Sequence, residues 1–209
     1  LGVTHVYLIP LYPQYSSSTT YSSIEDFAQS VKNIGWKDIN IDSIENFYTD
    51  ELYNSAILER IIETLQNSDP KNYDLVFSAH GLPKKLDAED GGIYERHVNE
   101  HVRLLVDKLK NNQIYFNDIH LAYQSKLGPM EWLTPSLETT LKSLKNKRVI
   151  IFPIAFTIDN SETDYELSIE YAEVANELGF EDYKVCKCPN DHPLFAKALF
   201  QMYQNMSMK

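Results

Sequence analysis

The chain has 209 residues, of which 43% are hydrophobic and 23% are charged. This length allows one domain or parts of two, and the composition is that of a folded protein rather than a disordered one. The net charge of −11 argues against nucleic-acid binding, because an acidic chain repels a phosphate backbone. No apolar run reaches the ~18 residues of a membrane-spanning helix.

Short β-branched runs alternate with segments of helical periodicity. Strands are predicted at residues 3–9, 40–44, 73–79, 118–123, 149–155 and 183–188. Helices are predicted at residues 24–34, 50–66, 94–110, 136–144, 162–178 and 193–203. This order predicts an α/β fold with mostly parallel strands and helices on both faces. Residues 75–77 and 149–152 are apolar throughout, which is typical of strands buried on both faces.

Polar and aromatic side chains gather in four segments that follow predicted strands. These segments are residues 10–20, 78–83, 124–132 and 155–163. In an open α/β sheet, ligands bind outside the carboxyl ends of the strands. The sequence therefore predicts a large cleft lined by hydroxyl, aromatic, imidazole and carboxylate groups.

The same segments resemble the signatures of the ferrochelatase family, in the family's order. The matching stretches are LYPQYS at 11–16, SAHGLP at 78–83, YQSKLGPMEWL at 123–133, DNSETDYELSIEY at 159–171 and NDHPLF at 190–195. The resemblance implies a chelatase-like fold of two Rossmann-like halves, and insertion of ferrous iron into a porphyrin held between them. It also implies that about 100 residues, roughly one domain, precede this chain and supply one wall of the cleft.

The resemblance also implies a division of the chain. Residues 1–40 would complete the first Rossmann-like half, and residues 41–185 would form the second half with the catalytic side chains. Residues 186–209, which include the last helix, would pack back on the first half. The segment alone would therefore lack part of its active site.

His80 and Glu162 are the predicted catalytic residues and metal ligands. Metallation needs a base for two pyrrole protons, and imidazole titrates near neutral pH. It also needs carboxylate or imidazole ligands that hold iron loosely. The resemblance implies that His80 lies beside the porphyrin centre and that Glu162 faces it. The alternatives are a histidine bonded to loop backbone and a glutamate that stabilises a helix start.

Acidic residues recur along the predicted helix at 162–178. Glu162, Glu166 and Glu170 are four residues apart, which places them on one helix face. We predict that these carboxylates bind the metal on its path to the cleft, although an acidic solvated face has the same pattern. Ser161 and Asp164 are predicted to cap this helix.

Further contacts with the porphyrin are implied by the resemblance. The predicted residues are Tyr12, Tyr15, Ser16, Ser18, Gln124 and Trp132. Core packing is an alternative for Trp132, and Gln124 and Ser125 are also candidates to hold the His80 loop by hydrogen bonds. Asn160 stands where the family often has histidine, and an amide cannot take up a proton at neutral pH.

Cys186 and Cys188 are the two cysteines of the chain. They are predicted to be buried free thiols of a cytoplasmic protein, since adjacent disulfides are strained and the cytoplasm is reducing. Two cysteines cannot ligate a [2Fe–2S] cluster, so no iron–sulfur cluster is expected. Fe²⁺ is expected as a substrate and porphyrin as the partner, with peripheral membrane contact in the complete protein. The oligomeric state is not predicted.

A second pattern, HVNEH at residues 97–101, matches the H-x-x-E-H motif of zinc proteases. The surrounding helix is amphipathic and no distant third ligand is apparent, so we expect solvent-exposed histidines. Porphyrin metallation is the favoured function. The alternatives are a chelatase for another metal such as cobalt or for another tetrapyrrole, and a non-catalytic porphyrin-binding fragment.

Overall fold

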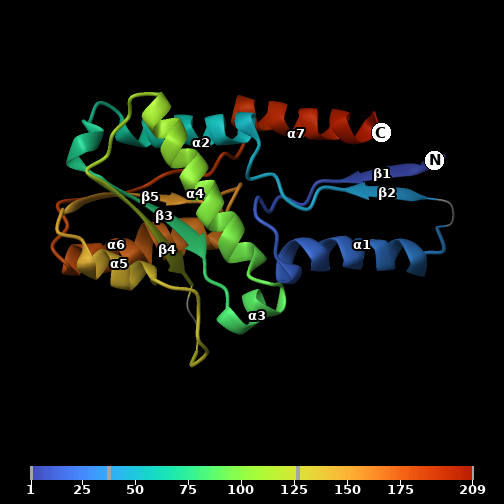
Figure 1. Cartoon of the computed structure of the whole chain (residues 1–209), viewed down its shortest axis with the longest axis horizontal. Coiled ribbons are helices and arrows are strands. Elements are labelled where there is room, and N and C mark those ends of the chain that lie inside the picture. Colours follow the sequence, from blue (N-terminus) through green and yellow to red (C-terminus); the bar gives the residue numbers. More distant parts are fainter. Residues whose placement is uncertain (1, 37–38, 126–127, 209) are drawn as a thin grey trace.

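The computed structural model describes residues 2–36, 39–125 and 128–208 as an α/β fold with two parallel sheets (Figure 1). One sheet pairs β1 with β2, and the other has the strand order β4-β3-β5-β6. The strands are β1 (His5–Leu8), β2 (Asn40–Ser43), β3 (Asp74–His80), β4 (Asp118–Gln124), β5 (Arg148–Pro153) and β6 (Asp182–Val185). The α/β prediction is confirmed.

Helices follow the strands as the periodicity predicts. They are α1 (Ser22–Asn33), α2 (Glu51–Leu65), α3 (Lys84–Glu89), α4 (Ile93–Asn111), α5 (Leu137–Ser143), α6 (Tyr171–Glu177) and α7 (Pro193–Ser207). Two π-helices, Ser17–Tyr21 and Glu162–Glu170, and a 3₁₀ turn at Pro70–Asn72 complete the set in the described residues. The prediction of one α-helix over 162–178 is wrong in its first half, where the chain forms a π-helix. The sequence pattern does not predict α3, which is too short for a clear period.

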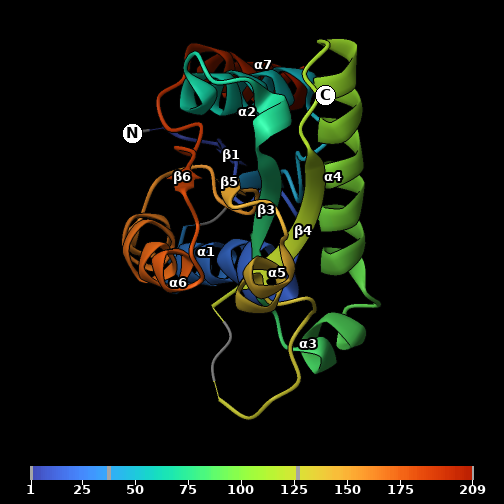
Figure 2. The same ribbon diagram turned by 90° about the vertical axis from the view of Figure 1, so that its left-hand side faces the viewer.

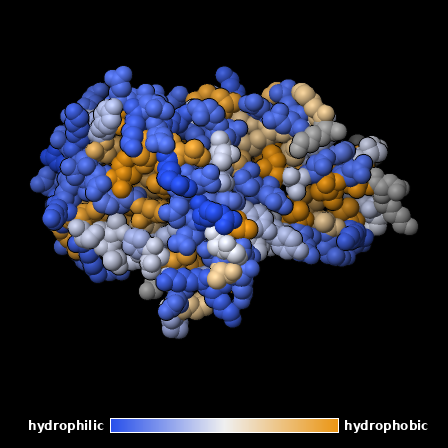
Figure 3. All heavy atoms as spheres, viewed as in Figure 1, coloured by the Kyte–Doolittle hydropathy of each residue, from blue (hydrophilic) through white to orange (hydrophobic). Residues whose placement is uncertain are grey.

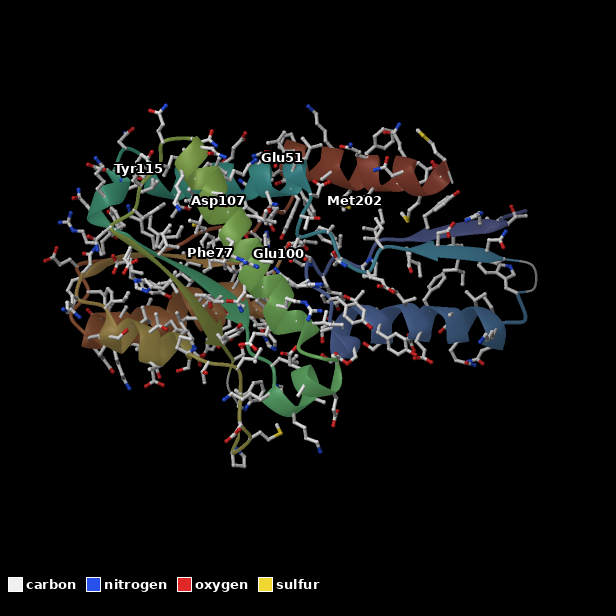
Figure 4. All side chains as sticks on the ribbon, viewed as in Figure 1. Glu51, Phe77, Glu100, Asp107, Tyr115 and Met202 are labelled. Atoms are coloured by element: carbon white, nitrogen blue, oxygen red, sulfur yellow. The ribbon has the colours of Figure 1, made fainter. Side chains whose placement is uncertain are left out.

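Side chains of the four-stranded sheet alternate between two apolar layers. Leu75 and Phe77 pack in the layer that contains side chains of α2, α4 and α7. Val76, between them, packs with side chains of α5 and of the π-helix Glu162–Glu170. Figure 2 shows α4 and α6 on opposite sides of this sheet. Lys108 of α4 pairs with Glu51, at the start of α2 (Figure 4).

The carboxyl ends of both sheets face the middle of the molecule. In Figure 1, the arrows of β1 and β3 come from opposite sides of the molecule, and their carboxyl ends point toward each other. In the register of the four-stranded sheet, His80 lies beside Gln124, and Ser78 lies beside Pro153. The segments that leave β1, β3, β4 and β5 therefore converge, as the sequence predicts for a ligand site.

The last helix contacts both parts of the fold. α7 packs along α2, and the ring of Tyr203 lies edge-on to the ring of Tyr7 in β1, with centroids 5.4 Å apart. The division into residues 1–40, 41–185 and 186–209 stays a prediction. Both cysteines are free and buried, as predicted.

The exposed surface is mixed. On the face in Figure 3, hydrophilic residues predominate and apolar residues form separate patches, one of them at the end that carries β1, β2 and α1. Among the described residues, no helix has the length and apolarity that crossing a membrane requires.

Candidate active site

A cavity of about 880 Å³ lies at the carboxyl ends of β1, β3 and β5. Its walls are mostly apolar and come from three places: the segment after β1 with α1, the segment after β3, and the segment after β5. Apolar lining residues include Ile9, Leu11, Phe27, Leu82, Phe156 and Ile158. Three predicted porphyrin-binding residues, Tyr12, Ser16 and Ser18, line it too. Its size falls in the range of cavities that bind drug-sized organic molecules.

His80 and Glu162 meet at one end of this cavity. His80 ends β3 and Glu162 begins a π-helix, and the two are 82 positions apart in sequence yet their Nδ1 and Oε2 atoms lie 2.7 Å apart. Nδ1 is buried, and within the described residues it makes no aligned hydrogen bond, although the carboxylate of Glu162 lies close to it. A buried nitrogen without such a bond is available to a ligand.

Backbone and ring contacts hold the imidazole in place. The hydroxyl of Tyr94 donates to the carbonyl of His80 over 2.8 Å, and the ring of Phe156 lies edge-on to the imidazole at 6.1 Å. The next residue, Gly81, donates its N–H to the carbonyl of Gln124 over 2.9 Å. A Cβ at position 81 would collide with that carbonyl oxygen, which explains why glycine follows the histidine.

A second cavity of about 720 Å³ lies on the other side of the same pair. His80 and Glu162 line both cavities, so they stand between them. The second cavity is acidic, since Glu138, Glu166 and Glu170 line it. Glu162, Glu166 and Glu170 therefore share one side of their helix, although the described residues contain no group of three such ligands close enough to hold a metal ion on their own.

Hydrogen bonds from the end of β4 fix Glu166. Ser125 donates its backbone N–H to Oε1 over 2.7 Å and its hydroxyl to Oε2 over 2.5 Å. The Ser125 hydroxyl also lies 3.3 Å from Oε2 of Glu162, and the amide of Gln124 lies 3.3 Å from Oε2 of Glu166. Gln124 and Ser125 thus hold the two glutamates. Gln124 also holds the His80 segment, as predicted, since its side chain accepts the hydroxyl of Ser78 and its carbonyl accepts the N–H of Gly81, whereas Ser125 bonds the glutamates instead.

The π-helix begins on Asn160, and the predicted cap by Ser161 and Asp164 is wrong. Oδ1 of Asn160 accepts the N–H of Glu162 over 2.8 Å, and Oγ1 of Thr163 accepts the N–H of Asn160 over 2.8 Å. Ser161 makes no capping bond with its side chain. The amide at position 160 thus orients the helix start that carries Glu162, a task that needs an acceptor and no proton transfer.

Three predicted porphyrin-binding residues lie away from the large cavity. Gln124 is almost fully buried and accepts the hydroxyl of Ser78, Trp132 lines the acidic cavity, and Tyr15 lies outside both. Burial, followed by Glu45 and Asp90, raises the pKa of Tyr15. Lys126 and Leu127, in the predicted YQSKLGPMEWL motif, lie outside the described residues.

Sequence reasoning missed several residues that build the site. Gln14 and Tyr94 line the large cavity, as does Phe156. Asp159 accepts N–H groups of Cys188 and Asn190, which anchors the segment before the π-helix. Gln14 stands inside the LYPQYS motif, which was the available signal. Asn190 likewise stands inside the NDHPLF motif, whereas Tyr94 lies outside the matching stretches and its hydrogen bond to the His80 carbonyl joins two separate elements.

The prediction that His97 and His101 are solvent-exposed is wrong. His101 is completely buried, and His97 is partly buried against the ring of Tyr48, with centroids 4.6 Å apart. Helix α4 crosses the segment after β1, so the face that carries both histidines is covered. Neither belongs to a metal-binding group within the described residues.

The ferrochelatase family model matches residues 1–207. The chain belongs to the ferrochelatase family. A ferrochelatase of Sulfurimonas denitrificans is 52% identical to it over 205 residues, which are 98% of this chain and 64% of that protein. A ferrochelatase of Nitratiruptor sp. is 50% identical, over 98% of this chain and 65% of that protein. The chain thus spans less than two-thirds of the length of these ferrochelatases.

Solved chelatase structures share the fold of this ferrochelatase-family chain. SirB from Bacillus subtilis with Fe³⁺ aligns with a TM-score of 0.65 at 13% identity, over 97% of this chain and 71% of that one. CbiX, described as the terminal enzyme of sirohaem biosynthesis in denitrifying bacteria, aligns with a TM-score of 0.61 at 14% identity, over 96% and 76%. At such identities the likeness shows the fold alone, and it confirms the chelatase-like prediction.

Proposed function

We propose that this chain is the catalytic part of an enzyme that inserts ferrous iron into a porphyrin. The reaction exchanges two pyrrole protons for one Fe²⁺ and yields haem. One observation carries the proposal: His80 and Glu162 approach to 2.7 Å between a large apolar cavity and a smaller acidic one. Such a pair stands where a flat apolar substrate and a cation would have to meet.

The large cavity is the proposed porphyrin site. Apolar walls favour the macrocycle by the hydrophobic effect, and the hydroxyls of Tyr12, Ser16 and Ser18 supply polar contacts. His80 is the proposed proton acceptor, because Nδ1 is buried without an aligned hydrogen bond and imidazole changes charge near neutral pH. Glu162, beside it, would stabilise the imidazolium as each pyrrole proton leaves.

The acidic cavity is the proposed entry for the metal. Oxygen ligands bind Fe²⁺ without trapping it, so the carboxylates of Glu170, Glu166 and Glu162 would pass the ion toward His80. Ser125 holds Glu166 and Glu162 near one another. Three carboxylates arranged as a single site would bind Fe²⁺ more tightly than carboxylates that follow one another along the helix. Weak binding suits this path, because the ion must move on to the porphyrin.

Substitution of His80 by alanine in the full-length protein tests the proposal. We expect metallation to be abolished while the thermal unfolding temperature stays close to that of the wild type. His120→Ala is the matched control, since this partly buried histidine of β4 lines neither cavity. Normal turnover by His80→Ala would refute the assignment.

The choice of metal and tetrapyrrole is a separate part of the proposal. Insertion assays with Fe²⁺, Co²⁺ and Zn²⁺ on the full-length protein would test it, with the fastest turnover expected for Fe²⁺ and protoporphyrin or coproporphyrin. A cytoplasmic location is also proposed, and the two free buried cysteines support it. Peripheral membrane contact and the lack of an iron–sulfur cluster stay predictions.

A further inference from the structure

The HVNEH segment of α4 has no place in the proposed reaction, yet its second histidine is among the most buried polar groups of the chain. His101 is 0% exposed, and each ring nitrogen has a partner. The amide nitrogen of Gln14 lies 2.8 Å from Nδ1, and Oδ1 of Asn54 lies 2.8 Å from Nε2. A histidine so placed holds together the segment after β1, α2 and α4.

Backbone carbonyls at both ends of this chain of bonds fix the direction of every hydrogen bond in it. The amide of Gln14 donates to the carbonyl of Ile154 over 3.1 Å, and the amide of Asn54 donates to the carbonyl of Tyr48 over 2.9 Å. A carbonyl only accepts, so the nitrogen of each amide must face it. Nδ1 of His101 must then accept from Gln14, and Nε2 must donate to Asn54. Only the neutral imidazole with its proton on Nε2 satisfies both.

This arrangement leaves the side chain of Gln14 able to accept a further hydrogen bond but not to donate one. Its two N–H bonds are directed at His101 and Ile154, so its carbonyl oxygen is the remaining polar atom of the side chain. Gln14 also lines the large cavity beside Tyr12 and Ser16. The side chain of Gln14 itself can therefore offer the cavity a hydrogen-bond acceptor but no donor.

The same helix holds the backbone of that wall. Nδ1 of His97 accepts the N–H of Tyr15 over 3.3 Å, and the carboxylate of Asp90, just before α4, accepts the N–H of Ser17 over 2.9 Å. Glu100 lies between the two histidines in the sequence of α4 and is labelled in Figure 4, and its carboxylate accepts the hydroxyl of Tyr48 over 2.8 Å. Two histidines of α4 and the aspartate that precedes the helix thus bond the segment around Gln14 at three points.

We propose that His101 is a positioning residue that orients the amide of Gln14, so that this wall of the cavity binds a hydrogen-bond donor of the porphyrin through the Gln14 oxygen. The donor would be a pyrrole N–H of the metal-free macrocycle, because the porphyrin's carboxylates are ionised at neutral pH and can only accept. This inference rests on the proposed function, since it takes the large cavity as the porphyrin site. A zinc-protease role is excluded by the bonds, because both ring nitrogens of His101 are occupied.

Burial alone lowers the pKa of His101 to about 3, which agrees with the neutral form that the bonds require. The titratable groups that face its ring are Tyr48 and Tyr53, with ring centroids 6.0 and 5.8 Å away. Both are neutral hydroxyls whose own pKa values are raised by burial. The positioning role therefore persists across the neutral pH range.

The test measures binding of metal-free protoporphyrin to the full-length protein by quenching of fluorescence. His101→Leu, which can neither accept nor donate, should raise the Kd about 10-fold or more. His101→Gln restores one acceptor and one donor and should recover most of the affinity. Val98→Ala is the matched control, because Val98 is equally buried on α4 but has no polar link to the segment after β1. It should lose stability and keep the affinity.

A double substitution separates positioning from general damage. Gln14→Leu alone should weaken binding as His101→Leu does, and the two together should weaken it no further, since one acts through the other. Unchanged affinity in His101→Leu, or equal losses in His101→Leu and Val98→Ala, would overturn the inference while His80→Ala still tests the proposed function. A wild-type protein that does not bind the porphyrin would overturn both.

Discussion

Replacement of Gly81 by alanine should separate the histidine from its glutamate. The added methyl group would overlap the carbonyl oxygen of Gln124 and lie 3.2 Å from Cε3 of Trp132. Ordinary carbon contacts need ~3.5 Å or more, so relieving the overlap requires a shift of about 1 Å. That shift would lengthen the 2.9 Å bond from the Gly81 N–H to Gln124 and would move His80 relative to Glu162, now 2.7 Å apart.

Two magnitudes follow from this geometry. Overpacking of this kind costs about 1–3 kcal/mol of stability. A misplacement of about 1 Å lowers the rate of a positioned reaction by about 10²-fold. The assay is iron insertion by the full-length protein at a temperature where the variant stays folded, with thermal unfolding measured in parallel.

Gly179→Ala serves as the control for lost stability. Gly179 has a φ of +75° with nothing within 4 Å of an added Cβ, so alanine there costs about 1–2 kcal/mol through backbone strain alone. It lies after α6, far along the chain from the helix start that carries Glu162. Wild-type turnover in Gly81→Ala, or an equal loss of turnover in Gly179→Ala, would refute the reasoning.

Three further predictions concern the cap, a thiol and pH. Asn160→Ala should lower the free energy of unfolding by about 0.5–2 kcal/mol in denaturant titrations and should also slow metallation. An unchanged stability together with an unchanged metallation rate would show that the cap does not hold Glu162. Burial raises the pKa of Cys186 to about 12, so it should resist alkylation at pH 8 until denaturant is added; rapid labelling of the folded protein would contradict its burial. The folded pKa of His101, about 3, lies below the ordinary 6.5, so the unfolded chain binds the extra proton and stability falls as pH drops from about 6.5 toward 3. The contribution of His101 to the slope of the unfolding free energy against pH approaches about 1.4 kcal/mol per pH unit, and His101→Gln should lack this contribution. Identical pH dependence of unfolding in both proteins would contradict the assignment.

The sequence predicted the strands well because their signal is local. Runs such as residues 75–77 and 149–152 are apolar enough to be buried on both faces, and they are. The convergence of His80 and Glu162 was also predictable, since each follows a strand and parallel strands end at one edge of the sheet.

Other features depend on contacts that no local pattern records. The π-helix at Glu162–Glu170 has the same polar and apolar spacing as an α-helix, so periodicity could not separate them. His101 lies on a helix that is amphipathic by pattern, and its burial depends on Gln14 and Asn54 from distant segments. The resemblance implied that Gln124 contacts the porphyrin, but its side chain accepts the hydroxyl of Ser78 and donates to the carboxylate of Glu166.

A crystal structure of the full-length protein with a bound porphyrin tests the central claim most directly. That claim is that His80 and Glu162 stand between the site of the macrocycle and the path of the metal. We predict that the macrocycle fills the cavity of about 880 Å³, with its pyrrole nitrogens toward Nδ1 of His80. A porphyrin bound elsewhere, with His80 and Glu162 away from its centre, would contradict the account.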